Sequence, residues 1–167
     1  MSWSAPPVFT VGQVLTAAQQ NILSDDLTYL KANALDYKEV TTPQTSTATT
    51  AAAATAIITG NAVTYDGSTI VAVEFYAGAV QHSAANALVL LNLYDGATDL
   101  GIIARLATSA TAATADFVSA KRQLTPSAAA HTYSIRAWTT IAGTITAAIG
   151  AGGPATDLPM FMRITKA

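Results

Sequence analysis

The sequence predicts a mainly β protein, a jelly-roll or β-sandwich of about eight strands preceded by an extended arm and one short α-helix. Two observations carry this prediction. Short apolar runs recur from residue 56 onward, and turn residues separate them about every 8–15 positions. The first forty residues differ, because prolines come first and an apolar stripe at helical spacing follows them. We therefore expect two parts, an N-terminal arm and helix over residues 1–40 and a sandwich domain over residues 41–167.

The arm holds aromatic side chains in a segment that cannot be helical. Trp3, Pro6 and Phe9 lie within it, and proline both fixes its own φ and restrains the residue before it. The arm has no local core for these rings to enter. Because buried aromatic residues are typical anchors of interfaces, we expect the arm to attach the protein to a larger body.

A helix is predicted to begin at Thr16, since Thr16 and Gln19 have the spacing of a capping box. An apolar stripe follows it at helical spacing, formed by Leu23, Leu27, Leu30 and Ala34. The stripe could pack on its own domain, dock on a larger body, or join three copies as a coiled coil. Docking or packing is favoured, because about four turns barely cover two heptads.

The sandwich begins after a segment from Val40 to Ala54 that consists almost only of Thr, Ala, Ser, Pro and Gln, which we interpret as a connection or an edge segment. Within the first long strand, Val71, Val73 and Phe75 share one face, whereas Glu74 lies on the other. The expected strands cover residues 56–59, 62–65, 69–77, 88–94, 100–106, 115–124, 132–139, 144–149 and 160–165.

The composition is apolar and poor in charge, with 51% hydrophobic and 11% charged residues. An ordinary domain carries about a quarter charged residues, so we expect another copy of the chain to cover part of this surface. The long charge-free segments contain Asn, Gln, Pro or Gly, which argues against a membrane span. The opening residues lack the pattern of a secretory signal peptide. Eight scattered basic residues make no nucleic-acid-binding stripe, and there is no cysteine for a disulfide or a thiolate metal site.

Few residues point to chemistry. His82 and His131 lack the paired spacing of a metal site, and we expect His131 to be a turn or packing residue at a strand start. Asp95 and Asp99 flank one loop but match no calcium motif. A Ser/His/Asp constellation stays open, although no nucleophile elbow is present. For Glu74 we expect an ion pair or hydrogen bond, with Arg136 as one candidate partner. We predict no catalytic residue, no metal site and no cofactor.

Two groups of motifs carry a resemblance to known proteins. Trp3-x-x-Pro6 and the run from Phe9 to Asn21 resemble the N-terminal segment of many tailed-phage virion proteins. The downstream part is similar to jelly-roll domains of actinophage minor structural proteins, which look like trimeric tumour-necrosis-factor-type sandwiches. The motifs that carry this second resemblance lie at residues 73–77, 93–96, 124–126, 131–137 and 162–165.

The resemblance implies a non-enzymatic structural protein on the surface of a phage particle. We expect a homotrimeric decoration or fibre-like knob bound to capsid or tail proteins, without nucleic-acid or membrane partners. An alternative is a receptor-binding module that recognises a host-surface glycan or protein. A third, an enzyme such as a depolymerase, has little support because the chain holds few paired carboxylates. The expected attachment residues are Trp3, Pro6, Phe9, Leu15, Leu23, Leu27 and Leu30.

Overall fold

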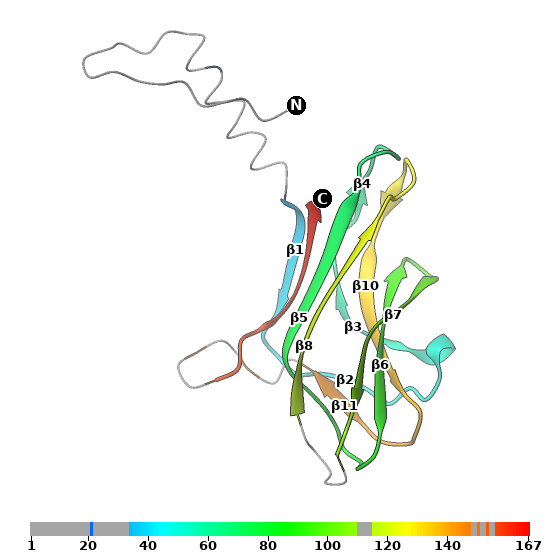
Figure 1. Cartoon of the computed structure of the whole chain (residues 1–167), viewed down its shortest axis with the longest axis vertical. Coiled ribbons are helices and arrows are strands. Elements are labelled where there is room, and N and C mark those ends of the chain that lie inside the picture. The colour runs from blue at the N-terminus through cyan, green and yellow to red at the C-terminus, as the bar shows by residue number, and fades with distance from the viewer. Residues whose placement is uncertain (1–20, 22–33, 110–114, 148–149, 151–152, 154–155) are drawn as a thin grey trace, which may run out of the picture.

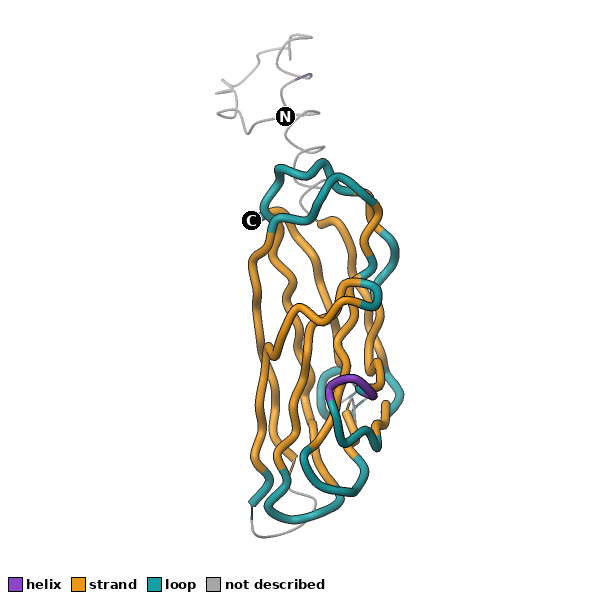
Figure 2. The backbone as a smooth tube through the Cα atoms, turned by 90° about the vertical axis from the view of Figure 1, so that its right-hand side faces the viewer, coloured by secondary structure: helices purple, strands orange, loops and turns teal. Residues whose placement is uncertain are grey.

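The computed structural model describes residues 21, 34–109, 115–147, 150, 153 and 156–167. Two antiparallel sheets pack face to face and their strands run along the long axis of the molecule (Figures 1 and 2). This arrangement confirms the predicted mainly β, sandwich fold.

The first sheet contains, side by side, β1 (Ala34–Val40), β12 (Met160–Lys166), β5 (Val71–His82) and β8 (Ala115–Leu124). Two short strands complete this sheet. Strand β11 (Ile145–Ala147) pairs with the last residues of β5, and β2 (Gln44–Ser46) pairs with β11. The chain thus leaves and re-enters each sheet, and its first and last described strands are neighbours, as in a jelly roll.

The second sheet has the order β3 (Thr55–Thr59), β10 (Tyr133–Thr139), β6 (Leu88–Asp95) and β7 (Thr98–Ala107). A separate small ladder joins β4 (Val63–Thr64) to β9 (Ala130–His131), and a 3-10 turn, η1 (Ala51–Ala53), precedes β3. Strands β6 and β7 form a hairpin, as the turn signal at Asp95 and Gly96 predicts.

The core lies between the two sheets and is formed by alternate residues of each strand. Fully buried side chains of the first sheet include Phe75, Met162 and Ile164, and those of the second include Leu91 and Ile135. Each such side chain contributes about 1.5–3 kcal/mol by leaving water, so this two-sided packing is the main stabilising contribution.

Strand β1 differs from the sequence expectation. Ala34 was expected to continue the helical stripe and residues 35–40 to belong to the N-terminal part, but these residues pair with β12 in the sandwich. Asp36 points inward and accepts hydrogen bonds from the backbone and side-chain nitrogens of Asn61, both at 2.9 Å. Long-range pairing of this kind overrides local propensity.

The expected arm and the expected helix, apart from Asn21 and Ala34, fall outside the described residues. This holds for every expected attachment residue: Trp3, Pro6, Phe9, Leu15, Leu23, Leu27 and Leu30. Asn21 is described, and it is helical and exposed. Across the described ranges, no helix is long and apolar enough to cross a membrane.

We call the end of the sandwich at which β1 begins the proximal end, and the opposite end the distal end. At the proximal end, Ala34 at the start of β1 lies opposite Thr165 of β12, so residues 1–33 join the sandwich there (Figure 1). At the distal end, residues 83–87 connect β5 to β6 and residues 140–144 connect β10 to β11.

Candidate functional site

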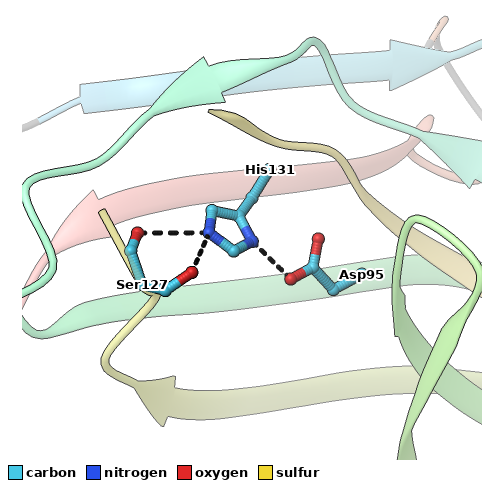
Figure 3. Close-up of polar contacts among 3 residues, drawn as sticks. All are labelled: Asp95, Ser127 and His131. Atoms are coloured by element: carbon cyan, nitrogen blue, oxygen red, sulfur yellow. Dashed lines mark hydrogen bonds and ion pairs between the residues drawn. The ribbon is translucent and has the colours of Figure 1, made fainter. Parts of the chain in front are cut away.

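Three polar side chains meet at the proximal end of the sandwich: Ser127, His131 and Asp95, which we call the proximal cluster (Figure 3). The Nδ1 atom of His131 lies 2.5 Å from the Oδ2 atom of Asp95. Its Nε2 atom lies 3.0 Å from the Oγ atom and 3.2 Å from the carbonyl oxygen of Ser127. The side chains of His131 and Asp95 are 14% and 23% exposed, so water screens their contact only in part.

Three elements bring these residues together. Asp95 ends β6, where Gly96 turns the chain with a φ of +55° into the β6–β7 hairpin. Strand β8 ends at Leu124, before Pro126, which suits a loop because it cannot donate to a ladder. The Ser127 carbonyl then accepts the Ala129 amide at 2.8 Å and closes the loop 125–129 in front of β9.

Two tyrosine rings form the floor of the proximal cluster. Tyr133 stacks on His131 with ring centroids 6.2 Å apart, and Tyr65 meets His131 edge-on at 5.7 Å. Burial, with smaller contributions from Asp36 and Asp95, raises the pKa of Tyr65 to about 12. Burial also raises the pKa of Tyr133 above its usual range. Both phenols therefore stay neutral and contribute apolar packing around the imidazole.

The contacts of the proximal cluster follow the order of a Ser-His-Asp triad, with a carboxylate on Nδ1 and a hydroxyl on Nε2. One contact distinguishes it from a nucleophilic triad. In a triad the unprotonated Nε2 atom accepts the serine proton, but here Nε2 also faces the Ser127 carbonyl oxygen. Nε2 thus has one oxygen neighbour that can donate to it and one that can only accept from it. A charged imidazolium would donate to the carbonyl and hold the loop, whereas a neutral ring would accept from the hydroxyl.

The polar residues that stand out in the sequence take the following positions in the structure. His131 lies at a strand start and packs on tyrosines, as predicted, and it also pairs with Asp95. Asp99 accepts hydrogen bonds from the Asn92 side chain and the Gly101 amide, both at 2.8 Å. The ring of His82 is fully buried near the distal end, where its Nδ1 atom accepts the Ala84 amide at 3.0 Å.

Glu74 makes the expected ion pair, but with a partner other than Arg136. Its carboxylate accepts from Arg163 on the neighbouring strand β12 at 2.6 Å. Arg136 instead lies over the Tyr94 ring at 4.1 Å and donates to the Gly96 carbonyl at 2.7 Å. The sequence did not indicate a role for Ser127, because an exposed serine in a loop has no distinguishing pattern.

A second candidate site lies on the outer face of the first sheet. Three aromatic rings cross strands β1, β12 and β5 there, and we call Tyr37, Phe161 and Tyr76 the aromatic row. Tyr37 stacks on Phe161 with centroids 5.8 Å apart, and Phe161 stacks on Tyr76 at 5.5 Å. Tyr37 is 52% exposed, and the other two rings are partly exposed. Stacked rings turned to solvent on a sheet are typical of a surface that a partner covers.

Another exposed apolar side chain lies on β8, at the edge of the same sheet. Phe117 on β8 is 73% exposed, while its neighbour Val118 points into the core. It borders an open groove of about 500 Å³ between β7 and β8, which Ile103 and Leu106 also line. A second cavity of about 200 Å³ lies at the proximal end, with Leu35 and Lys166 in its wall.

The outer face of the second sheet differs, because the chain covers part of it. The Tyr94 hydroxyl donates to the Ala51 carbonyl at 2.8 Å, and the Thr139 amide donates to the Ala48 carbonyl at 2.9 Å. Asn92 on this face is only 3% exposed and accepts from the Trp138 indole at 2.9 Å. The segment after β2 therefore hydrogen-bonds to residues of the second sheet and covers part of its outer face. The aromatic row is the better candidate for contact with another molecule.

Within the described ranges, no group of three or more His, Asp or Glu residues is arranged to hold a metal ion. Comparison with known proteins adds no assignment. No family model matches the sequence, and no characterised protein is significantly similar to it.

Proposed function

We propose that the chain is a non-enzymatic structural protein of a tailed-phage particle, a trimeric knob attached to the capsid or tail through its N-terminal arm and helix. One observation carries the proposal, the aromatic row on the outer face of a jelly-roll sheet. The resemblance of the sequence to virion jelly-roll proteins supplies the setting.

The aromatic row supports self-association because of what surrounds it. The Glu74 and Arg163 pair lies beside it, and Tyr37 donates to Glu39 at 2.7 Å. The charges of Glu74 and Arg163 are thus already paired within the subunit, and the Glu39 carboxylate accepts a hydrogen bond, so a neighbour could cover the rings without separating the Glu74–Arg163 pair. An apolar centre with a paired polar rim is the usual anatomy of a subunit interface.

The ends of the sandwich support the proposed attachment. Residues 1–33 enter at the proximal end, so the distal loops would face away from the particle. Residues 83–87 and 140–144 contain Ser, Ala, Asn, Thr, Ile and Gly, without an aromatic ring. A glycan site usually offers aromatic faces beside carboxamides, so these loops favour decoration over the receptor-binding alternative.

Light scattering coupled to size-exclusion chromatography tests the oligomer. The wild-type chain should be a trimer, and Phe161→Ser should shift it towards monomer by removing the central ring of the aromatic row. Ile141→Ser is the matched control, because Ile141 is an exposed apolar residue of a distal loop. A wild-type monomer, or equal effects of the two variants, would overturn the interface.

Incorporation into particles tests the attachment separately. Deletion of residues 1–33 leaves β1 intact and should give a folded sandwich that no longer joins phage particles in a complementation experiment. Particles that still carry the shortened chain would show that the arm and helix are not the anchor. Glycan-array binding by the wild-type chain would favour the receptor alternative.

A further inference from the structure

The hydrogen bonds that the two ring nitrogens of His131 can make depend on whether the ring is charged. Both ring nitrogens face oxygen acceptors, since Nδ1 lies 2.5 Å from the Asp95 carboxylate and Nε2 lies 3.2 Å from the Ser127 carbonyl (Figure 3). A ring that donates to both must carry two protons, because each nitrogen donates only when protonated. In the neutral ring, Nε2 would turn a lone pair towards the carbonyl, and the Ser127 hydroxyl at 3.0 Å would be its remaining partner.

The surroundings of the ring identify which groups can respond to pH. Asp95 approaches from β6, Tyr133 from β10, and Tyr65 from the segment after β4. The two phenols stay neutral, because burial raises the pKa of each. Arg136 donates to the Gly96 carbonyl of the hairpin turn and lies over the Tyr94 ring. Asp95 and His131 are therefore the groups whose charge changes alter this contact.

We propose that His131 is a proton-operated clamp, which in its charged form ties the loop 125–129 to the β6–β7 turn. The charged ring bridges the Asp95 carboxylate and the Ser127 carbonyl. When the ring loses its second proton, Nε2 can no longer donate to the carbonyl, and the charged pair with Asp95 weakens to a neutral hydrogen bond. The loop then keeps the contact of the Ser127 hydroxyl with Nε2 and the backbone bond from the Tyr65 amide to the Ala129 carbonyl, both at 3.0 Å.

The loop 125–129 lies close to the turn 66–69, which shares a cavity with Leu35 of β1. Ala128 in the loop lies close to Gly67, since a Cβ atom added to Gly67 would be only 3.0 Å from the Ala128 nitrogen. Gly67 belongs to the turn 66–69, whose residues Asp66 and Thr69 line the proximal cavity together with Leu35 of β1. Release of the loop would therefore loosen the turn that forms part of the wall of this cavity.

The charge of the His131 ring determines in which direction pH changes the stability of the closed loop. A proton on His131 stabilises the closed loop, so this contribution is present while the ring is charged and is lost as pH rises through its titration. Protonation of Asp95 would remove the carboxylate partner of the ring.

Nuclear magnetic resonance of the full-length chain tests the clamp. The nitrogen signals of His131 should show both ring nitrogens protonated while the loop is closed. Native-state hydrogen exchange of the Ala129 and Tyr65 amides, corrected for intrinsic base catalysis, should accelerate about tenfold as the ring deprotonates, the equivalent of one net hydrogen bond. The Leu91 amide in the core strand β6 is the internal reference and should not respond.

Two variants separate the clamp from its alternatives. His131→Gln keeps a donor but cannot titrate, so the pH response should vanish. Ser127→Ala removes the hydroxyl and keeps the carbonyl, so the response should persist. Loss of the response in Ser127→Ala would overturn the proposal in favour of a hydroxyl-to-imidazole relay. An unprotonated Nε2 in the closed wild-type chain would also overturn it, and this measurement does not depend on how the variants fold.

Discussion

Gly143 offers the sharpest prediction of stability, because its backbone and its surroundings both exclude a side chain. Its φ is +148°, a region that is nearly reserved for glycine. A Cβ atom there would lie 2.4 Å from the Cε1 atom of His82 and 2.9 Å from the Ser83 hydroxyl. The His82 ring cannot withdraw easily, because it is fully buried and its Nδ1 atom accepts the Ala84 amide.

The expected cost of Gly143→Ala is the sum of two effects. The backbone contributes about 1–3 kcal/mol, and forcing a methyl group into a packed region adds about 1–3 kcal/mol. Gly96→Ala is the matched control, since Gly96 has a φ of +55° and nothing lies within 4 Å of its added Cβ atom. The control should cost only about 1–2 kcal/mol.

Equilibrium unfolding in urea measures both costs. With a slope of roughly 1–3 kcal/mol per molar, Gly143→Ala should lower the midpoint clearly more than Gly96→Ala does. In a His82→Ala background, Gly143→Ala should lose the part of its cost that comes from the His82 ring and retain the backbone cost and the contact with Ser83, which a double-mutant cycle separates. The reasoning fails if the two glycine variants cost the same, or if removing the His82 ring leaves the cost of Gly143→Ala unchanged.

Three further outcomes are expected. Leu91→Ala should destabilise the fold by about 2–5 kcal/mol in urea unfolding, because this fully buried side chain lies between the sheets, and a loss under 1 kcal/mol would contradict the assigned core. Hydrogen bonds from Thr69 and Ser68 hold the pKa of Asp66 below its usual range. The destabilisation caused by Asp66→Ala should therefore be present at neutral pH and shrink as pH falls through that lowered pKa, whereas a constant difference across an acid titration would refute the turn's role. A fluorophosphonate probe should label Ser127 no more than it labels a Ser127→Ala variant by mass spectrometry, since Nε2 of His131 faces a carbonyl, and specific labelling would reveal a nucleophile.

The sequence by itself determined the fold class, because strand alternation is local. Val73 and Phe75 are buried and Glu74 is turned outward, as a period of two requires, and the turns at Gly67 and Gly96 have positive φ angles. The pairing partner of Glu74 was beyond the sequence. Both Arg136 and Arg163 have the right charge, and only the neighbouring position of β12 selects Arg163.

Strand β1 shows where local signals fail. Residues 34–40 follow a helical stripe and include charged side chains, so nothing in their own pattern predicts a strand. Pairing with β12, at the other end of the chain, decides their conformation because it satisfies backbone donors and acceptors that would otherwise lack partners.

Both candidate sites depend on contacts of the same long-range kind. Tyr37, Tyr76 and Phe161 are ordinary aromatic residues in the sequence, and they become one row only because β1, β12 and β5 are neighbours. Asp95 meets His131 because β6 pairs with β10. Local patterns thus determined which segments become strands, and the pairing order of the sheets decided which side chains meet, since that order depends on the packing of the whole core.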